Sequence, residues 1–307
     1  LVAGLVLMII FVLVASFVVI PALLPFGKTQ AVATPKPTPS PTPTPTPSPT
    51  PIPSPTPTVV QVRIYPTYLM DVTTGKVLIN IESTLRLPMA STTKIMTAIL
   101  AIENFNLNEK VTVTQEELDE IPPGGYSIAF LRANDQLSML DILYGLLLPS
   151  GCDAALVIAH EVGGSTANFV SMMNAKARVL GLANTHFANP AGFNDDNNYS
   201  SAADLTKLAR YAMNLSAFAT IVQQTDHVVP AGLHNHRYDN WQNLNQLLNL
   251  YPGADGVKTG NSDASGYCLV FSARRNGHHL IGAIMQEGQD TLYSDAMQAL
   301  DGGFAKV

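Results

Sequence analysis

The amino-acid sequence predicts an α+β fold, in which one antiparallel sheet is flanked by helices and a helical region separates the first strands from the last. Two observations predict this fold. Strand-like runs of alternating or β-branched apolar residues lie towards both ends of the chain, at residues 67–72, 77–81, 256–260, 267–273 and 279–285. Between these runs, apolar residues recur at helical spacing. A sheet in which the first and last strands of the chain are neighbours satisfies this order.

The middle of the chain contains five predicted helices. In the first, over residues 91–105, Ile95, Met96 and Ile99 place apolar side chains along one stripe. The same spacing predicts helices over residues 138–148, 153–162, 167–180 and 202–213. A last helix is predicted over residues 292–304, after the final strand.

Residues 1–24 carry no charged side chain and are dominated by Leu, Val, Ile and Phe. A helix of this length crosses a hydrocarbon core about 30 Å thick, so we expect a transmembrane anchor. A cleaved secretory signal is the alternative, because Ala31, Val32 and Ala33 resemble a signal-peptidase site. The apolar run is longer than the roughly 7–15 residues typical of a signal peptide, which favours the uncleaved anchor.

Residues 34–58 alternate almost strictly between Pro and Thr or Ser. Such a segment has too little apolar surface and too few backbone donors to form a core. We expect an extended, disordered polyproline stalk that holds the following domain away from a membrane, with a plain flexible linker as the alternative. Residues 59–307 are long enough for one substantial domain, which we expect to be catalytic.

The composition limits the kinds of molecule that the chain is expected to bind and the cross-links that it is expected to form. The formal net charge is −6, only 13% of the residues are charged, and no basic stripe is present, so no nucleic-acid partner is expected. Two cysteines, Cys152 and Cys268, are too few for a disulfide scaffold, although they could pair with each other outside the cytoplasm. The apolar run around Cys268 predicts a buried small hydrophobic residue instead.

Ser91 and Lys94 form the first motif that carries chemistry. Their spacing of three residues at a predicted helix start places both side chains on one face. The lysine amine would then accept the proton of the serine hydroxyl, provided that burial lowers its pKa. Backbone N–H groups at the helix start would stabilise an oxyanion. This motif is weak alone, because a helix start with a solvated lysine gives the same pattern.

Ser150, Gly151 and Cys152 form the second motif, in a predicted loop between two helices. A hydroxyl at this point could relay a proton between Lys94 and a leaving amine. The alternative is a simple helix break with Asp153 at the start of the next helix.

Lys258, Thr259 and Gly260 form the third motif, on a predicted strand. The ammonium and hydroxyl groups suit a substrate carboxylate, and the glycine allows the backbone to approach a ligand closely.

The three motifs occur in one order, and together with residues 184–190, 199–205 and 253–260 they resemble the low-molecular-weight penicillin-binding proteins. These are D-alanyl-D-alanine carboxypeptidases of the S11 serine peptidase family. The resemblance covers residues 67–304. It implies a fold like that of the serine β-lactamases and penicillin-binding transpeptidases.

The resemblance also implies roles for single residues. Ser91 would be the acylated nucleophile, Lys94 its proton acceptor and Ser150 the proton-relay serine. Lys258 and Thr259 would bind the terminal carboxylate of the substrate. The backbone N–H groups of Ser91 and Asn261 would form the oxyanion hole, while Cys152 and Gly260 would also contact the substrate.

The implied activity is removal of the terminal D-alanine from peptidoglycan stem peptides ending in D-Ala-D-Ala, through an acyl-enzyme on Ser91. β-Lactam antibiotics would be inhibitors, and no cofactor or metal is expected. The catalytic domain would lie on the extracytoplasmic side of a bacterial cell membrane, held there through the N-terminal segment. A D,D-transpeptidase and a non-catalytic peptidoglycan-binding protein are the alternatives. A β-lactamase is disfavoured, because the chain has no Glu-x-x-Leu-Asn deacylating motif in its middle segment.

The chain departs from the common family pattern in four places. Cys152 replaces an asparagine that would bond the substrate peptide, and a thiol donates and accepts only weakly. Some members with this Ser-Gly-Cys motif favour transpeptidation. Ala191 stands where several members have a histidine, and residues 286–290 lack an arginine that assists carboxylate binding. The chain reaches Val307 without the C-terminal β-domain of many members, so the N-terminal segment is expected to supply the anchor.

Three other groups of polar residues are predicted to be structural. His234 and His236 have no third ligand at a supporting spacing, so surface or packing roles are expected rather than metal binding. Residues 195–198 are most simply a turn rather than a calcium site. Trp241 and residues 243–245 are likewise expected to be structural.

Overall fold

The structure, a computed structural model, describes residues 65–229 and 239–307, which belong to one compact unit. The expected anchor at residues 1–24, the expected stalk at residues 34–58, and His234 and His236 lie outside the described residues. No helix in the described part of the chain combines the length and the apolar character needed to cross a membrane.

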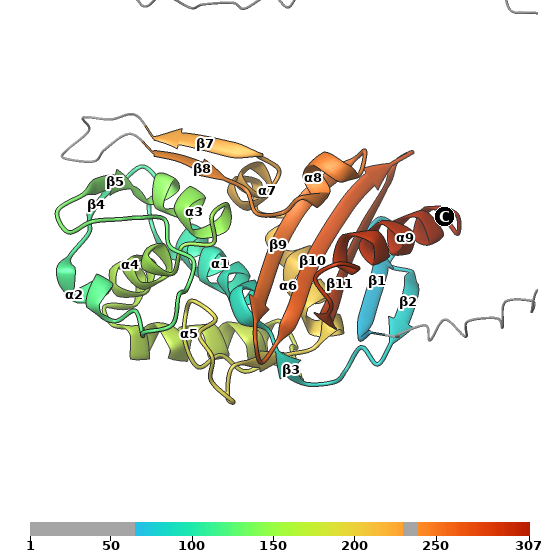
Figure 1. Cartoon of the computed structure of the whole chain (residues 1–307), viewed down its shortest axis with the longest axis horizontal. Helices are drawn as coiled ribbons and strands as arrows, with labels where there is room; N and C mark the ends of the chain where they lie inside the picture. The colour runs from blue at the N-terminus through green and yellow to red at the C-terminus, as the bar shows by residue number, and fades with distance from the viewer. Residues whose placement is uncertain (1–64, 230–238) are drawn as a thin grey trace, which may run out of the picture. The chain divides into compact units, whose positions relative to one another are not determined.

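A five-stranded antiparallel sheet organises the domain (Figure 1). Its strands are β1 (Thr67–Asp71), β2 (Val77–Ile81), β9 (Ala254–Ser262), β10 (Gly266–Arg275) and β11 (His278–Glu287). They lie in the order β2-β1-β11-β10-β9, so the first strand of the chain is hydrogen-bonded to the last. The predicted antiparallel sheet, with its first and last strands as neighbours, is therefore confirmed.

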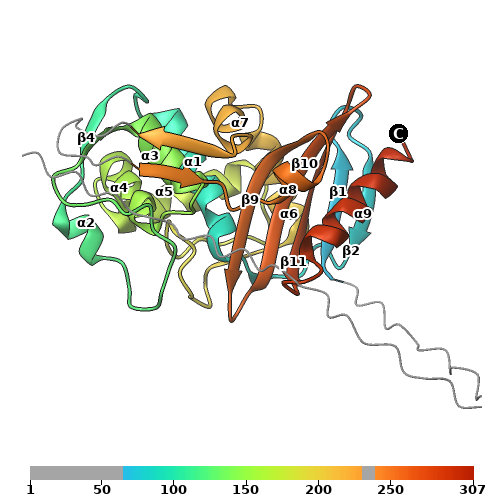
Figure 2. The same ribbon diagram turned by 45° about the horizontal axis from the view of Figure 1, so that its top comes forward.

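Successive side chains of β10 point to opposite faces of the sheet. Leu269 and Phe271 pack in a buried cluster with Leu292 and Leu300 of α9 (Leu292–Phe304). Val270, which points the other way, belongs to a larger cluster shared with α6 (Ala202–Ala212). Figure 2 shows α9 on one side of the sheet and α6 on the other. Both faces of the sheet are consequently covered by helices.

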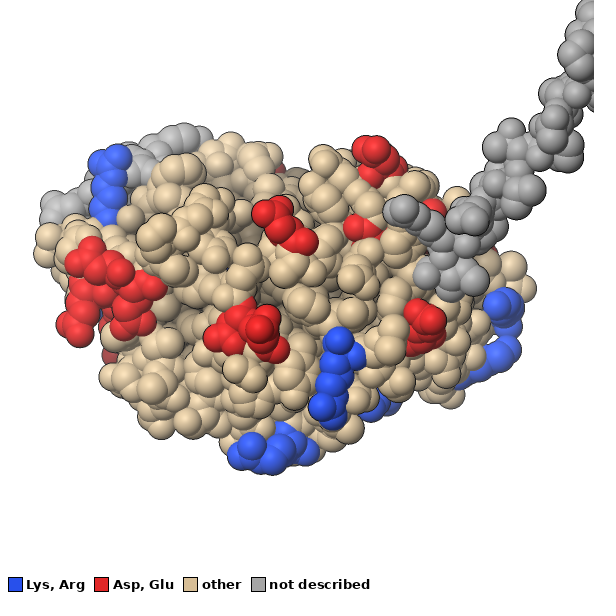
Figure 3. All heavy atoms as spheres, turned by 60° about the horizontal axis from the view of Figure 1, so that its bottom comes forward, with Lys and Arg blue, Asp and Glu red and all other residues tan. Residues whose placement is uncertain are grey.

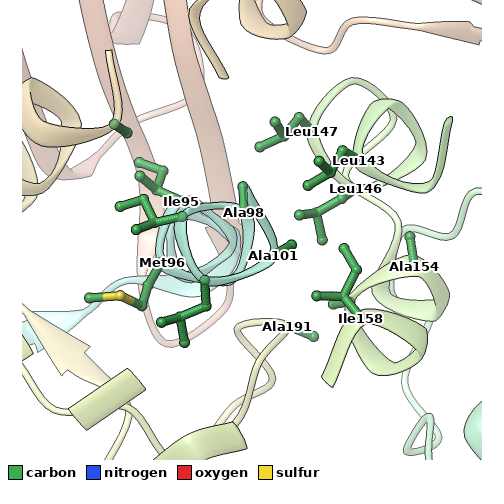
Figure 4. Close-up of a cluster of buried hydrophobic side chains, with 14 of the residues drawn as sticks. Ile95, Met96, Ala98, Ala101, Leu143, Leu146, Leu147, Ala154, Ile158 and Ala191 are labelled. Atoms are coloured by element: carbon green, nitrogen blue, oxygen red, sulfur yellow. The ribbon is translucent and has the colours of Figure 1, made fainter. Parts of the chain in front are cut away.

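Helix α1 (Lys94–Asn104) lies in the middle of the helical region. In Figure 4, Ala101 points towards Leu146 and Ile158, which are fully buried. Those two residues come from α3 (Met139–Leu147) and α4 (Cys152–Gly163). Because α1 is packed on several sides at once, its apolar residues are not confined to one stripe.

The remaining helices pack around this core. They are η1 (Ala90–Thr93), α2 (Gln115–Asp119), α5 (Thr166–Val179), α7 (Ser216–Val222) and α8 (Leu247–Leu250). Side-chain oxygens of Ser138, Ser165 and Ser201 accept backbone N–H groups in the first turns of α3, α5 and α6. These caps satisfy donors that have no partner within a helix and so fix where each helix begins.

Three short antiparallel pairs complete the domain. They are β3 (Leu87–Pro88) with β6 (Tyr199–Ser200), β4 (Lys110–Thr112) with β5 (Gln136–Ser138), and β7 (Asp226–Val229) with β8 (Asp239–Gln242). Trp241 on β8 is buried and its indole N–H donates to the carbonyl of Ala129 at 2.9 Å. The predicted structural role of Trp241 is therefore confirmed.

Most predicted elements differ from the structure by one or two residues at an end, and two of the differences bear on the site. The helix predicted over residues 91–105 begins instead as the 3-10 turn η1, because Ala90 has a left-handed φ of 44° and the regular α-helix starts only at Lys94. The strand predicted over residues 256–260 extends from Ala254 to Ser262, since Ala254 at one end and Asn261 and Ser262 at the other also pair with β10. The last helix has the predicted bounds.

Charged side chains are sparse on the surface. Figure 3 shows the acidic and basic residues of one face as separate groups, with most of that face belonging to neither class. This distribution agrees with the low charged fraction of the sequence, 13%.

Candidate active site

Ser91 and Lys94 lie at the junction between η1 and α1. The 3-10 turn carries the serine, and the lysine is the first residue of the α-helix. The lysine Nζ donates a hydrogen bond of 2.9 Å to the serine Oγ. The structure therefore places the two side chains of the first motif on one face, in direct contact.

The amine of Lys94 is fully buried and contacts three groups. Besides Ser91, it donates to the Sγ of Cys152 at 3.4 Å and to the backbone carbonyl of Ala191 at 2.6 Å. Burial lowers the pKa of Lys94 below its ordinary value, and the negative character of Cys152 and Asp153 only partly opposes this. A lysine of this kind can lose its proton and act as a base.

Lys258 lies on β9 and is 2% exposed. Its Nζ donates to the backbone carbonyl of Thr259 at 3.1 Å. Burial, and then the positive charge of Lys94, hold the pKa of Lys258 well below its ordinary value. Because each cation disfavours the other, the state with both lysines protonated is disfavoured.

Ser150 has an unusual backbone conformation. Its backbone has a left-handed φ of 64°, which is uncommon for a residue other than glycine. The side chain is 3% exposed, and its Oγ has no hydrogen-bond partner among the described residues. Packing alone does not account for a buried hydroxyl of this kind, which is a feature of functional sites.

A cleft of about 510 Å³ opens above this cluster. The predicted site residues that line it are Ser91, Ser150, Cys152, Thr259, Gly260 and Asn261. Tyr126, Ser127 and Asn194 also line it, although no sequence pattern predicted them as site residues. Leu244, which lies in a stretch predicted to be structural, lines it as well. Lys94 and Lys258 are not among the lining residues, so the two lysines act from beneath the surface of the cleft.

Gly260 lets strand β9 run directly beside Ser91. A methyl group on its Cα would lie 3.0 Å from the backbone nitrogen of Thr92 and 3.1 Å from that of Ser91. A side chain here would force the neighbouring turn to move by a few tenths of an ångström. The close backbone approach predicted at this glycine therefore exists, but its neighbour is the turn that carries Ser91.

The loop after Pro190 contributes a group that the sequence reasoning missed. Asn189 Oδ1 accepts the backbone N–H groups of Ala191, Gly192 and Phe193, at 3.2, 2.7 and 2.9 Å. These bonds hold the carbonyl of Ala191 against Lys94. A backbone carbonyl has no residue-type signature, although the family-like residues 184–190 end one position before it.

Asp153 ties the segment around Ala129 and Leu131 to the start of α4. Its carboxylate accepts the backbone N–H groups of Ala129, Leu131 and Ala154 at 2.8, 3.0 and 2.9 Å. Burial raises its pKa, although these hydrogen bonds act in the opposite direction. The position predicted for Asp153 at a helix start is confirmed.

Both cysteines are free and buried, so the pairing of Cys152 with Cys268 considered from the sequence is wrong. Burial raises the pKa of Cys268 to about 11, and its sulfur lies 3.8 Å from the carbonyl oxygen of Ser265. Cys268 is thus a small buried residue, as predicted. Cys152 differs, because its sulfur contacts the amine of Lys94.

Within residues 65–229 and 239–307, no three potential His, Cys, Asp or Glu ligands cluster in a way that would hold a metal ion. Asp195 Oδ1 accepts the N–H of Asn197 at 2.7 Å, and its carbonyl accepts the N–H of Asn198 at 2.9 Å. Residues 195–198 therefore form the predicted turn.

A buried lysine amine bonded to a serine hydroxyl, beneath a cleft and beside a second buried lysine, defines a serine acyl-transfer enzyme. Comparison with known proteins gives the family. Residues 55–289 match the sequence profile of Peptidase S11, described as D-alanyl-D-alanine carboxypeptidase. The chain belongs to this family, and the predicted family and enzyme class are confirmed.

Relatives and solved structures agree with this assignment. The chain is 40% identical over 250 residues to the D-alanyl-D-alanine carboxypeptidase of Streptomyces sp. strain K15, covering 78% of this chain and 86% of that protein. It is 36% identical over 222 residues to DacF of Bacillus subtilis, covering 70% and 55%.

The crystal structure of the Streptomyces K15 DD-transpeptidase superimposes with a TM-score of 0.74 at 39% identity, covering 78% of this chain and 96% of that one. A penicillin-binding protein homologue from Mycobacterium tuberculosis gives 0.72 at 30% identity, covering 80% and 94%. The predicted fold class is confirmed.

Proposed function

We propose that the chain is a serine D,D-peptidase that removes the terminal D-alanine from peptidoglycan stem peptides ending in D-Ala-D-Ala. The observation that carries this proposal is the 2.9 Å hydrogen bond between Lys94 Nζ and Ser91 Oγ, made by a lysine whose pKa is lowered by burial. The family description and the names of the relatives support the substrate class.

In the first step, the neutral amine of Lys94 takes the proton of Ser91 while its Oγ attacks the carbonyl between the two D-alanines. The backbone N–H groups of Ser91 and Asn261 stabilise the oxyanion that develops. Both residues line the cleft, and the close approach of Gly260 to Ser91 keeps the strand and the turn together.

In the second step, the C–N bond breaks and the leaving amine takes up a proton. Ser150 relays that proton from Lys94, which explains a buried hydroxyl with no partner among the described residues. Free D-alanine leaves, and water then attacks the ester on Ser91 with Lys94 again acting as the base.

The substrate carboxylate is bound at the third motif. The Thr259 hydroxyl lies in the cleft lining, and Lys258 supplies positive charge from beneath it. A carboxylate close to both lysines would offset their mutual repulsion and favour protonation of Lys258, which leaves Lys94 as the neutral base.

Mass spectrometry after penicillin treatment tests the proposal. The peptide that contains Ser91 should carry one penicilloyl group, because a β-lactam imitates the D-Ala-D-Ala end and acylates the same oxygen. The Ser91→Ala variant should carry none. Folded protein without an adduct on Ser91 would sink the proposal, and adduct formation without D-alanine release from a pentapeptide would indicate a non-catalytic binding protein.

A D,D-transpeptidase is the second candidate, in which an acceptor amine rather than water resolves the acyl-enzyme. Two observations favour it. Cys152 contacts Lys94 where an amide would be usual, and a solved relative bears the name DD-transpeptidase. An assay that supplies both water and an amine acceptor decides between the two, by comparing D-alanine release with the transpeptide product.

The location is part of the same proposal. The apolar residues 1–24 and the proline-rich residues 34–58 support an anchored domain on the outer side of a bacterial cell membrane. In intact cells, a fluorescent penicillin that does not enter the cytoplasm should label the chain, and the label should sediment with membranes. Labelling that requires cell lysis would contradict this location.

A further inference from the structure

We propose that Cys152 and Lys94 form an oxidation site, at which a hydroperoxide joins the thiol and the amine in a covalent sulfur–nitrogen bond. The proposal extends the proposed function, because the product would block acylation of Ser91. The chemistry at Cys152 itself does not depend on which substrate the enzyme uses.

The two reacting atoms already lie together. Lys94 Nζ is 3.4 Å from Cys152 Sγ, and both side chains are buried, so water does not separate them. Burial lowers the pKa of Lys94, which makes its neutral, nucleophilic form accessible. When the amine is instead protonated, it is the counter-charge for a thiolate at the same distance.

The position of Cys152 in the cleft also favours oxidation at this residue. Cys152 is only 2% exposed, but it lines the cleft, so an oxidant as small as hydrogen peroxide reaches its sulfur through the cleft. It is also the first residue of α4, a helix of 12 residues.

Cys268 is the internal comparison. It lines a neighbouring pocket of about 310 Å³. Among the described residues, however, no amine is hydrogen-bonded to its sulfur, and it lies on strand β10 rather than at the start of a helix. Burial raises its pKa to about 11, and its sulfur lies against the carbonyl oxygens of Pro88 and Ser265 at 3.9 and 3.8 Å. A thiol in such surroundings rarely forms the thiolate that reacts with peroxide. Oxidation should therefore select Cys152.

The first step is oxidation of the sulfur. The Cys152 thiolate attacks one oxygen of the hydroperoxide, the O–O bond breaks, and the departing hydroxide takes the proton of the Lys94 ammonium to form water. The sulfur loses two electrons to the peroxide and becomes a sulfenic acid.

The second step joins the two residues. The neutral Nζ of Lys94 attacks the sulfenic sulfur, an S–N bond forms, the S–O bond breaks, and hydroxide leaves with one amine proton as water. The long side chain of Lys94 allows Nζ to close the remaining 3.4 Å. Two equivalents of an added thiol reverse the bond, giving free thiol and amine together with one external disulfide.

The consequence is a reversible loss of the base. A nitrogen bonded to sulfur no longer accepts the proton of Ser91 Oγ, although the serine stays in place. General-base catalysis contributes on the order of a hundredfold or more, so fully oxidised protein should acylate slower by at least that factor.

The test treats the full chain with hydrogen peroxide and then follows two separate readouts. Peptide mass spectrometry should find the Lys94 and Cys152 peptides joined, with a combined mass lower by two hydrogen atoms. Acylation by a fluorescent penicillin should fall, and dithiothreitol should restore both. The Cys152→Ala variant, compared with its own untreated sample, should lose no acylation, whereas Cys268→Ala should behave as the unaltered chain.

Three outcomes would overturn the proposal. They are an unchanged peptide mass after peroxide, modification of Cys152 without a link to Lys94, and equal inactivation of Cys152→Ala and the unaltered chain. The mass readout keeps this inference separate from the proposed function. Untreated protein that never forms a penicillin adduct would refute the proposed function alone, because the cross-link would still be detected or excluded by mass.

Discussion

The Cα of Gly192 lies so close to the backbone of Ala90 that a methyl group on it would be 2.1 Å from the Ala90 carbonyl oxygen. Gly192 also has a left-handed φ of 87°. The loop that carries the Ala191 carbonyl is therefore pressed against the residue before Ser91, with no side chain between them. The position of the nucleophile depends on this contact.

Replacing Gly192 with alanine should damage both stability and activity. The new methyl group would overlap backbone atoms and adopt a φ that costs about 1–3 kcal/mol, so the free energy of unfolding should fall by at least that amount. Denaturant unfolding and the rate of penicillin acylation measure the two effects.

Gly302→Ala is the matched control, because no described atom lies within 4 Å of the added methyl group in helix α9. Alanine there should be neutral or stabilise the chain by up to about 1 kcal/mol. Equal unfolding free energies for the two variants would contradict the importance assigned to Gly192.

Ser150→Ala should separate activity from stability. The Ser150 hydroxyl is buried with no hydrogen-bond partner in the described part of the chain, so its removal leaves no donor or acceptor unpaired. We expect an unchanged or slightly higher free energy of unfolding, together with acylation slower by roughly 10²–10⁴-fold. Full activity in this variant would remove Ser150 from the proton relay.

The pH dependence of acylation should report Lys94. The base must be neutral, and burial lowers the pKa of Lys94 below the ordinary value of about 10.4. The acylation rate should therefore rise with pH and level off before that value is reached. As the pH falls below the pKa of Lys94, the amine is protonated and the rate should drop. A profile with its midpoint at the ordinary lysine pKa would argue against Lys94 as the base.

Cys152→Asn should change the fate of the acyl-enzyme. An amide both donates and accepts strong hydrogen bonds to a substrate peptide, whereas a thiol does neither well. We expect the ratio of D-alanine hydrolysis to amine transfer to rise relative to the unaltered chain, measured with both acceptors present. An identical ratio would show that Cys152 does not control this balance.

The sequence predicted a helix or strand correctly where its apolar residues follow one clear pattern. The apolar run at residues 267–273 and the helical spacing after Lys94 both survive in the structure, because the apolar side chains there pack against covered faces. The three short strand pairs were missed, since strands of two to four residues show no period.

The site was predictable only as far as chemistry depends on residue type. Ser91, Lys94 and Cys152 were named from the sequence and lie in contact in the structure. The left-handed backbone of Ser150 and the carbonyl of Ala191 were not, because both depend on tertiary packing rather than on side-chain identity. Asn189, whose side chain holds that loop, lies within residues 184–190, which resemble the family, but the sequence assigned it no role.

The contact between Lys94 and residue 191 also determines which substitutions the site tolerates. The acceptor is the main-chain oxygen, so it survives any replacement of the side chain at position 191 that leaves the loop intact. A replacement of Ala191 can then alter the neighbourhood of the base without removing its support.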